Sequence, residues 1–163
     1  MKVLKFGGTS VGSPESIKRV VEIIKNYKES KQHIAVVASA MSGVTNTLIE
    51  TGELAANNSD EYLRNLKELE NKHFQTVKDL LKVKNQSSVL AQIKKLTNEL
   101  EELMHGVYLL KEISPRTLDL ILSFGERLSC QILCSYSLQE GLDVEFLDAR
   151  KLIKTDDKFG KAR

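Results

Sequence analysis

Apolar and polar residues follow two different periods along the first thirty residues. Residues 3–6 form a short apolar run that leads directly into glycines, which predicts a strand followed by a tight loop. Ser13 and Pro14 then favour the start of a helix, because a serine side chain can cap free amides and proline suits the first helical position. Apolar residues recur at helical spacing after this point, which predicts one buried face. They are Ile17, Val20, Val21 and Ile24.

A second apolar run, residues 33–38, has no polar alternation and predicts a strand that is parallel to the first and covered on both faces. The connection between the two strands is expected to be right-handed. A loop of small residues, 39–43, follows and leads into a helix that begins near Val44 and Thr45. The polar cluster at residues 57–60 is expected to end this helix and to cap the next one.

Residues 60–112 are highly charged and carry two apolar stripes at helical spacing, which predicts an antiparallel helical hairpin with its turn near residues 84–87. The first stripe is Leu66, Leu69, His73, Val77 and Leu80, and the second is Ile93, Leu96, Leu100, Leu103, Val107 and Leu110. We favour an internal pair packed onto the rest of the chain over a coiled coil that binds a partner. His73 is expected to be a core histidine with satisfied hydrogen bonds rather than a ligand.

A long apolar helix is predicted after Ser114 and Pro115, which again combine a capping side chain with proline at the first helical position. Residues 118–138 are apolar on nearly all sides, which indicates a central position, and Gly141 ends the helix. Residues 144–147 are predicted to form a strand, and residues 152–155 a further short strand.

The composition describes an ordinary globular chain of one domain, with 163 residues, 41% apolar content and a formal net charge of +2. This charge gives no electrostatic reason to expect a nucleic acid or a membrane surface as partner. No apolar run approaches the roughly 18 residues that span a bilayer, and no signal peptide is visible, so we expect a cytoplasmic protein. Cys130 and Cys134 are expected to be reduced core residues, and the histidines show no metal-ligand spacing.

The order strand, glycines, helix start is one that binds phosphate, because glycines admit close approach and free amides attract negative charge. Gly7 and Gly12 have the spacing of a Walker A loop, but Ser13 stands where that motif needs lysine. No G-x-G-x-x-G dinucleotide fingerprint is present either. The lysine, Lys5, lies before the glycines at the end of a strand expected to be buried, where its charge is costly unless it meets an anion. Spacing alone leaves open a phosphate site or a plain glycine turn.

Four segments in order resemble the aspartokinases, a family within the amino acid kinase superfamily. They are residues 5–11 (KFGGTSV), 37–46 (VASAMSGVTN), 123–129 (SFGERLS) and 155–162 (TDDKFGKA), and they extend from one end of the chain to the other. The resemblance implies an α/β fold, a three-layer sandwich around a mainly parallel sheet of the carbamate kinase-like type. Residues 1–163 would be the N-terminal portion of the kinase domain, with the hairpin of residues 60–112 inserted in it. The rest of that domain and the ACT regulatory domains would be absent.

The activity implied by the resemblance is transfer of the γ-phosphate of ATP to the β-carboxylate of L-aspartate, giving β-aspartyl phosphate. This reaction is the first step of lysine, threonine and methionine biosynthesis, and ATP would enter with Mg²⁺ as the substrate complex. The acceptor carboxylate has an ordinary pKa near ~3.9, so it is ionised at neutral pH and needs no general base. The full-length enzyme is expected to be a homo-oligomer whose small-molecule partners are ATP and L-aspartate.

The resemblance also implies roles for particular residues, without a metal ligand among them. The catalytic residue would be Lys5, the ATP-binding residues Lys5, Phe6, Gly7 and Gly8, and the substrate-binding residues Ser39, Thr45 and Glu126. Glu126 needs a cation, because its carboxylate interrupts an apolar stretch. The substrate ammonium would supply this cation, and the alternatives are Lys5, Arg127 or another basic side chain. Thr45 would bind a substrate carboxylate at a helix start, or else act only as a helix cap.

Two other functions remain open from the sequence. The chain could belong to another member of the superfamily, similar to acetylglutamate kinase or glutamate kinase, or it could be a non-catalytic oligomerisation fragment built around the hairpin. The Thr-Asn and Gly-Glu elements favour aspartate. Because the family's remaining phosphate and nucleotide elements lie beyond this stretch, the isolated 163 residues are expected to be inactive.

Overall fold

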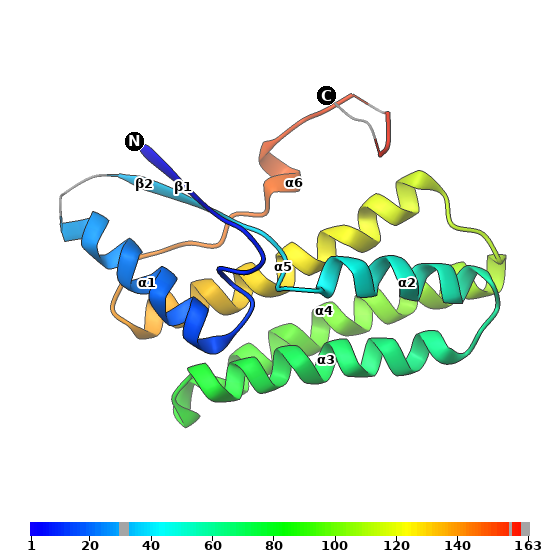
Figure 1. The fold of residues 1–163 in the computed structure, drawn as a ribbon, viewed down its shortest axis with the longest axis horizontal. Helices are drawn as coiled ribbons and strands as arrows, with labels where there is room; N and C mark the ends of the chain where they lie inside the picture. The colour runs from blue at the N-terminus through cyan, green and yellow to red at the C-terminus, as the bar shows by residue number, and fades with distance from the viewer. Residues whose placement is uncertain (30–32, 157, 161–163) are drawn as a thin grey trace.

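The computed structural model describes residues 1–29, 33–156 and 158–160, and the chain in this part is mostly helical (Figure 1). Four long helices, α2 to α5, pack against one another, and a pair of strands with α1 lies at one end of them. The elements in chain order are β1 (Lys2–Phe6), α1 (Pro14–Glu29), β2 (Ile34–Ala38), α2 (Val44–Ala56), α3 (Glu61–Leu80), α4 (Val83–Leu110), α5 (Pro115–Gln139) and α6 (Ala149–Leu152).

The two strands are parallel neighbours, as predicted, with Lys2 opposite Ile34 and Phe6 opposite Ala38. The prediction that β2 is covered on both faces was wrong for the part of the chain described, since Val36 and Val37 are 37% and 50% exposed. A sheet of two strands is narrow, and the described helices cover only part of it. The sandwich of three layers therefore stays a prediction.

Helix α1 begins and packs as its sequence indicated. The hydroxyl of Ser13 accepts a hydrogen bond from the amide of Ser16, at 3.2 Å. The four apolar residues at helical spacing, from Ile17 to Ile24, are all at most 3% exposed. Helix α2 ends and α3 begins within the polar cluster at residues 57–60, where Ser59 accepts from the amide of Glu61. Local capping and periodicity thus determine these boundaries.

Helices α3 and α4 form the predicted hairpin, and the first stripe is buried along its whole length. The second stripe is buried or half-buried except for Leu110, which is 77% exposed because α4 ends there. The hairpin packs against α2 and α5, as expected of an internal pair.

The position predicted for the hairpin turn, residues 84–87, was wrong. The chain reverses at Leu81 and Lys82, and α4 has already begun at Val83. Gln139 of α5 explains the difference, because its side-chain oxygen accepts from the amide of Lys82 at 2.7 Å and from the side chain of Asn85 at 3.0 Å. Asn85, one of the polar residues that suggested a loop, thus contacts a helix more than fifty residues away.

The two strands predicted after α5 were also wrong. Gly141 ends α5 with φ +81°, as predicted, but residues 142–148 contain neither helix nor strand. Residues 149–152 form α6, whose start is capped by Asp148 through the amide of Arg150 at 3.1 Å. A strand needs a hydrogen-bonding neighbour, and no strand in the described part of the chain pairs with these residues.

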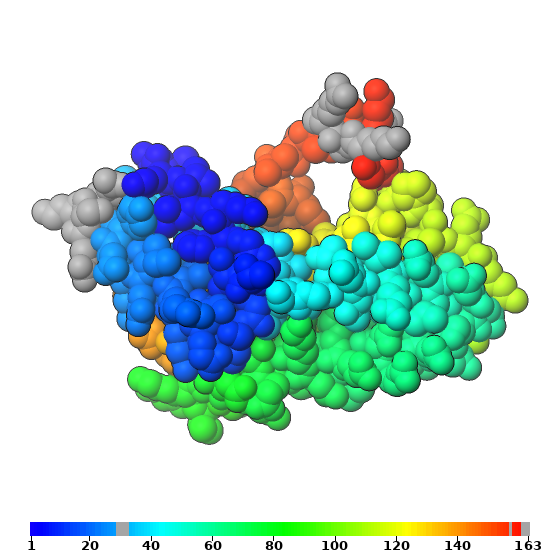
Figure 2. Space-filling model, viewed as in Figure 1, coloured from blue at the N-terminus to red at the C-terminus, as the bar shows by residue number. Residues whose placement is uncertain are grey.

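Residues after α6 pass away from the helices and meet them again near the start of α5 (Figure 2). The amide of Gly160 donates to Asp119 at 2.7 Å, and Arg116 lies over the ring of Phe159 at 5.6 Å. Part of the fourth resembling segment, namely residues 157, 161 and 162, lies outside the described residues.

A buried carboxylate joins the two hairpin helices. Glu70 of α3 is 4% exposed and accepts hydrogen bonds from Lys67, from Lys94 and from Thr97 at 2.6–2.7 Å. Burial alone would raise the pKa of Glu70, but these three donors outweigh it and lower the pKa to about 2. A hollow of about 270 Å³ beside this cluster is therefore lined by side chains that already satisfy one another.

His73, on the buried stripe of α3, is only partly satisfied, which corrects the prediction. Its Nδ1 lies 2.7 Å from the carbonyl oxygen of Leu69, and since a carbonyl can only accept, Nδ1 carries the proton. The other ring nitrogen, Nε2, is buried without a hydrogen-bond partner in the described part of the chain. Burial lowers the pKa of His73 to about 4, the Leu69 carbonyl opposes this, and Lys72 adds to the lowering.

We expect the stability of the protein to fall by about 2 kcal/mol between pH 7 and pH 5 because of His73. Its folded pKa of about 4 lies below the ordinary 6.5, so its contribution is complete above pH 6.5 and is lost as the pH falls towards 4. Urea denaturation at the two pH values measures this loss. His73→Leu should remove most of it, whereas the exposed His33→Gln should not; an equal pH dependence in all three proteins would contradict the assignment.

Candidate functional site

The first glycine loop follows β1 and closes with a turn in which the amide of Ser10 donates to the carbonyl of Gly7 at 2.9 Å. Lys5 is exposed, so the expectation that the strand is buried at this end was wrong. This ammonium lies close to Gly7, at 3.7 Å from the position that a Cβ would occupy there. The ammonium of Lys5 therefore lies beside the glycine loop and is accessible to an anion from solvent.

The glycines of this loop allow it to pack against the second loop, residues 39–43. A Cβ on Gly8 would lie 3.0 Å from the carbonyl oxygen of Ala40, and one on Gly12 would lie 3.0 Å from the Cβ of Ser42. Side chains at either position would push the two loops apart. Besides any part in phosphate binding, these glycines hold two of the resembling segments side by side.

The second loop begins at the end of β2 and leads into α2. Gly43, with φ +82°, precedes the helix and has no side chain to cap it. Thr45 lies in the first turn of α2, is exposed, and its hydroxyl makes no hydrogen bond to any described residue. The alternative that Thr45 is a plain helix cap is therefore wrong, and its hydroxyl is free to bind a ligand, whereas the amide of Val44 already donates to the carbonyl of Met41 at 3.0 Å.

The third segment lies on α5, and Gly125 brings it against the second loop. A Cβ on Gly125 would lie 2.8 Å from the Cβ of Ala40, so only glycine permits this approach. One carboxylate oxygen of the next residue, Glu126, accepts a hydrogen bond from the amide of Ala40 at 3.3 Å. The side chain of Glu126 is half-buried and faces the loop that carries Ser39.

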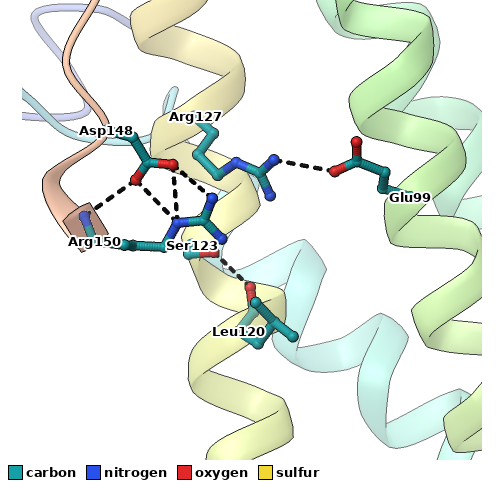
Figure 3. Close-up of polar contacts among 6 residues, drawn as sticks. All are labelled: Glu99, Leu120, Ser123, Arg127, Asp148 and Arg150. Atoms are coloured by element: carbon teal, nitrogen blue, oxygen red, sulfur yellow. Dashed lines mark hydrogen bonds and ion pairs between the residues drawn. The ribbon is translucent and has the colours of Figure 1, made fainter.

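Glu126 has no cation within ion-pair distance among the described residues. Arg127, one of the named alternatives, pairs with Glu99 of α4 at 3.1 Å (Figure 3) and lies over the ring of Phe124 at 4.3 Å. Lys5, the other alternative, makes no ion pair either. No other basic side chain among the described residues pairs with Glu126, so a half-buried carboxylate is left available for an external cation.

A second ion pair near Arg127 holds the chain after α5. Asp148 accepts from the guanidinium of its neighbour Arg150 at 2.6 Å, and this hydrogen bond lowers the pKa of Asp148 to about 2 (Figure 3). Arg127 contributes to the same lowering from a greater distance. These charges are satisfied within the chain, so they add no free group to the site.

Three of the four resembling segments therefore meet at the ends of β1 and β2, while the fourth, where it is described, lies near the start of α5. Phe6 is half-buried and also lines a separate hollow of about 280 Å³ with Thr9, Ser10 and Arg19. That hollow does not include Lys5 or Glu126, so it is distinct from the place where the segments meet.

Sequence reasoning missed Ser129, whose hydroxyl donates to the carbonyl of Ser39 at 2.6 Å. Its spacing of three residues from Glu126 on one helix was the available signal.

Cys130 and Cys134 are free and half-buried on α5, as expected of reduced core residues, and burial raises the pKa of each thiol. No three histidine, cysteine, aspartate or glutamate side chains come together as a metal site among the residues described. None of the helices in that part of the chain has both the length and the apolar content needed to cross a membrane.

The whole described chain matches one family. Residues 1–162 match the model of the amino acid kinase family. The chain belongs to the amino acid kinase family. This membership confirms the family resemblance of the glycine loop and its companion segments.

Curated members of the family that resemble this chain are aspartokinases. It is 35% identical over 159 residues to "Aspartokinase" of Schizosaccharomyces pombe, covering 93% of this chain and 30% of that protein. It is 38% identical over 163 residues to "Aspartokinase 1, chloroplastic" of Arabidopsis thaliana, covering 95% of this chain and 27% of that protein. The chain thus spans about a third or less of the length of these relatives.

A solved family member has the same fold. Aspartokinase III of E. coli, in complex with aspartate and ADP, superposes with a TM-score of 0.85 at 26% identity, over 99% of this chain and 34% of that one. A second structure of that enzyme, in complex with lysine and aspartate, also superposes with a TM-score of 0.85. The fold described above is therefore an aspartokinase-like fold.

Proposed function

We propose that the protein to which this chain belongs is an aspartate kinase. It would transfer the γ-phosphate of ATP to the β-carboxylate of L-aspartate, with this chain supplying one part of the active site. The observation that carries the proposal is a pair of charges without an ion-pair partner among the described residues, one beside each of the two joined loops. Lys5 offers an exposed cation at the glycine loop, and Glu126 offers a carboxylate without a cation partner at the second loop.

The positive charge of Lys5 suits the phosphates of ATP, and the negative charge of Glu126 suits the ammonium of aspartate. Phosphoryl transfer mostly needs positioning and neutralisation of charge on the phosphate oxygens, which Lys5 and the amides of Gly7 and Gly8 can provide. Phe6 belongs to the same loop and helps to hold it on the core. ATP would therefore lie with its phosphates over the glycine loop.

Aspartate has one ammonium and two carboxylates, and the second loop offers a counterpart for each kind of group. Glu126 would bind the ammonium, and Thr45 at the start of α2 would bind the α-carboxylate. Ser39, whose hydroxyl makes no hydrogen bond to a described residue, would add a further contact. The β-carboxylate would then point to Lys5 and the phosphate, already ionised at neutral pH.

Mg²⁺ would enter this site with ATP as part of the substrate. The described residues hold no cluster of histidine, cysteine, aspartate and glutamate side chains that would bind the ion by themselves. The ion would neutralise charge on the phosphates when bound. The residues of this chain would orient the substrates and neutralise the charge that remains on the phosphates.

ATP-dependent formation of aspartyl hydroxamate by the full-length protein tests this proposal. Hydroxylamine traps an acyl phosphate, so product should appear with L-aspartate and not with N-acetylglutamate or glutamate. Product with either of those substrates in place of aspartate would instead assign the protein to another member of the family. Absence of product with all three would contradict a kinase function.

The chain as given accounts for about a third of the relatives' length, and we propose that these 163 residues are the N-terminal portion of a kinase domain. In the same assay the isolated chain should give no product, because phosphate-binding elements are expected outside it. A cytoplasmic location and a homo-oligomeric full-length enzyme remain predictions, which fractionation and light scattering would check.

A further inference from the structure

Three consecutive residues at the end of β2 are bound by side chains of α5. The carbonyl of Ala38 accepts from the thiol of Cys130 at 3.7 Å, and the carbonyl of Ser39 accepts from the hydroxyl of Ser129 at 2.6 Å. The amide of Ala40 donates to the carboxylate of Glu126 at 3.3 Å. Positions 126, 129 and 130 share one face of the helix, so a single surface of α5 holds the start of the second loop.

These hydrogen bonds from α5 begin at the point where the hydrogen bonds between β1 and β2 end. The amide of Ser39 donates to the carbonyl of Phe6 at 3.1 Å, which is the last hydrogen bond between the end of β1 and the chain after β2. Beyond it, the backbone groups of the loop have no neighbouring strand, and buried polar groups need partners. Helix α5 supplies them because Gly125 allows it to approach Ala40 closely.

Ser129 makes the shortest of the three hydrogen bonds and is 1% exposed. Its hydroxyl also lies 3.1 Å from the carbonyl of Glu126, one turn earlier in its own helix. A hydroxyl has one proton, and the shorter distance shows that Ser39 is the main acceptor. The contact from the Ala40 amide to Glu126 is longer, at 3.3 Å, and involves the residue next to Ser39.

We propose that Ser129 is a positioning residue for the aspartate end of the active site, an inference that rests on the proposed function. By holding the carbonyl of Ser39, it sets the place of the Ser39 hydroxyl and of the Ala40 amide. That amide occupies one oxygen of Glu126 and leaves the other for the substrate ammonium. Ser129 itself is buried behind the loop and does not touch the substrate.

Replacing Ser129 with alanine in the full-length protein tests the inference. Ser129→Ala leaves the carbonyl of Ser39 without its donor, and the loop shifts away from its productive position. The KM for L-aspartate should rise on the order of tenfold, because one buried hydrogen bond is lost. The KM for ATP should stay within about twofold, because Lys5 and its glycine loop are held by β1. Initial rates of hydroxamate formation at varied aspartate and varied ATP give both constants.

Ser137→Ala is the matched control, since this serine lies two turns further along α5 and is 2% exposed. It should change neither KM. A role in folding alone would lower the apparent kcat with the folded fraction and leave both constants unchanged. Ser129→Cys keeps a side chain of similar volume and a weak hydrogen-bond donor, so it should give an intermediate KM for aspartate. This variant still tests the inference if the alanine variant misfolds.

The outcomes separate this inference from the proposed function. If the unchanged protein forms no aspartyl hydroxamate, the proposed function fails. If it does, and Ser129→Ala and Ser129→Cys keep the KM for aspartate of the unchanged protein, the positioning role is refuted while the function stands. An equal rise in the KM for ATP would also refute it, because the effect would then extend to the glycine loop.

Discussion

Replacing Lys5 with methionine should reduce kcat of the full-length protein by about 10² to 10³-fold, equivalent to about 3–4 kcal/mol of transition-state stabilisation. The ammonium of Lys5 stands at the glycine loop and makes no ion pair with a described residue. This ammonium is an exposed cation at the glycine loop, so its loss leaves the charge of the transferring phosphoryl group without this partner. Hydroxamate formation at saturating aspartate and ATP measures the change.

Lys2→Met provides the matched control, because Lys2 belongs to the same strand and is also exposed. Its ammonium lies over the ring of Tyr27 at 4.5 Å, away from the glycine loop, so this variant should keep its kcat. Neither substitution should alter the thermal unfolding midpoint by more than a few degrees, since both side chains are exposed. A kcat for Lys5→Met within about threefold of the unchanged protein would remove Lys5 from the catalytic site.

Replacing Glu126 with glutamine should raise the KM for L-aspartate on the order of 100-fold, with a smaller effect on the KM for ATP. The amide oxygen of glutamine can still accept from Ala40, so the loop contact is retained and only the negative charge is lost. The substrate ammonium would then meet a neutral group in a half-buried position. Initial rates over a wide range of aspartate concentration test this.

Glu99→Gln is the matched control for the charge, because Glu99 is also a half-buried carboxylate close to Arg127. It binds that arginine from α4 and does not contact the second loop, so the KM for aspartate should be nearly unchanged (Figure 3). Equal effects of the two substitutions would mean that Glu126 acts through the general charge of the region. No effect of Glu126→Gln would contradict its role as the ammonium ligand.

Much of the fold followed from local patterns in the sequence. Ser13 and Ser114 each cap the helix that the sequence predicted at that place, and the apolar stripe of α1 is fully buried. Errors arose where a distant contact outweighed the local pattern. The polar residues near position 85 suggested a turn, but Gln139 accepts from the side chain of Asn85 and from the amide of Lys82, and α4 begins earlier.

The site was predictable in its members but not in its geometry. The resemblance brought Lys5, Thr45 and Glu126 together as candidates, whereas spacing alone offered only an anion near a strand end. Nothing in the sequence indicated that Lys5 is exposed or that Arg127 is committed to Glu99. Only the positions of Lys5 and Arg127 in the structure showed that neither of them is the ion-pair partner of Glu126.

The sequence by itself determined the helices, the two parallel strands, the order of the motifs and the family. These features depend on caps, apolar periodicity and glycine positions, whose free energies are set by residues within one or two turns of each other. The tertiary structure alone decided how the motifs meet. The contacts of Glu126 and Ser129 with the second loop join residues 86 and 90 positions apart, and such contacts depend on how whole elements pack. Packing of this kind placed an exposed Lys5, and a Glu126 without an ion-pair partner in the described part of the chain, beside two loops held together by glycines.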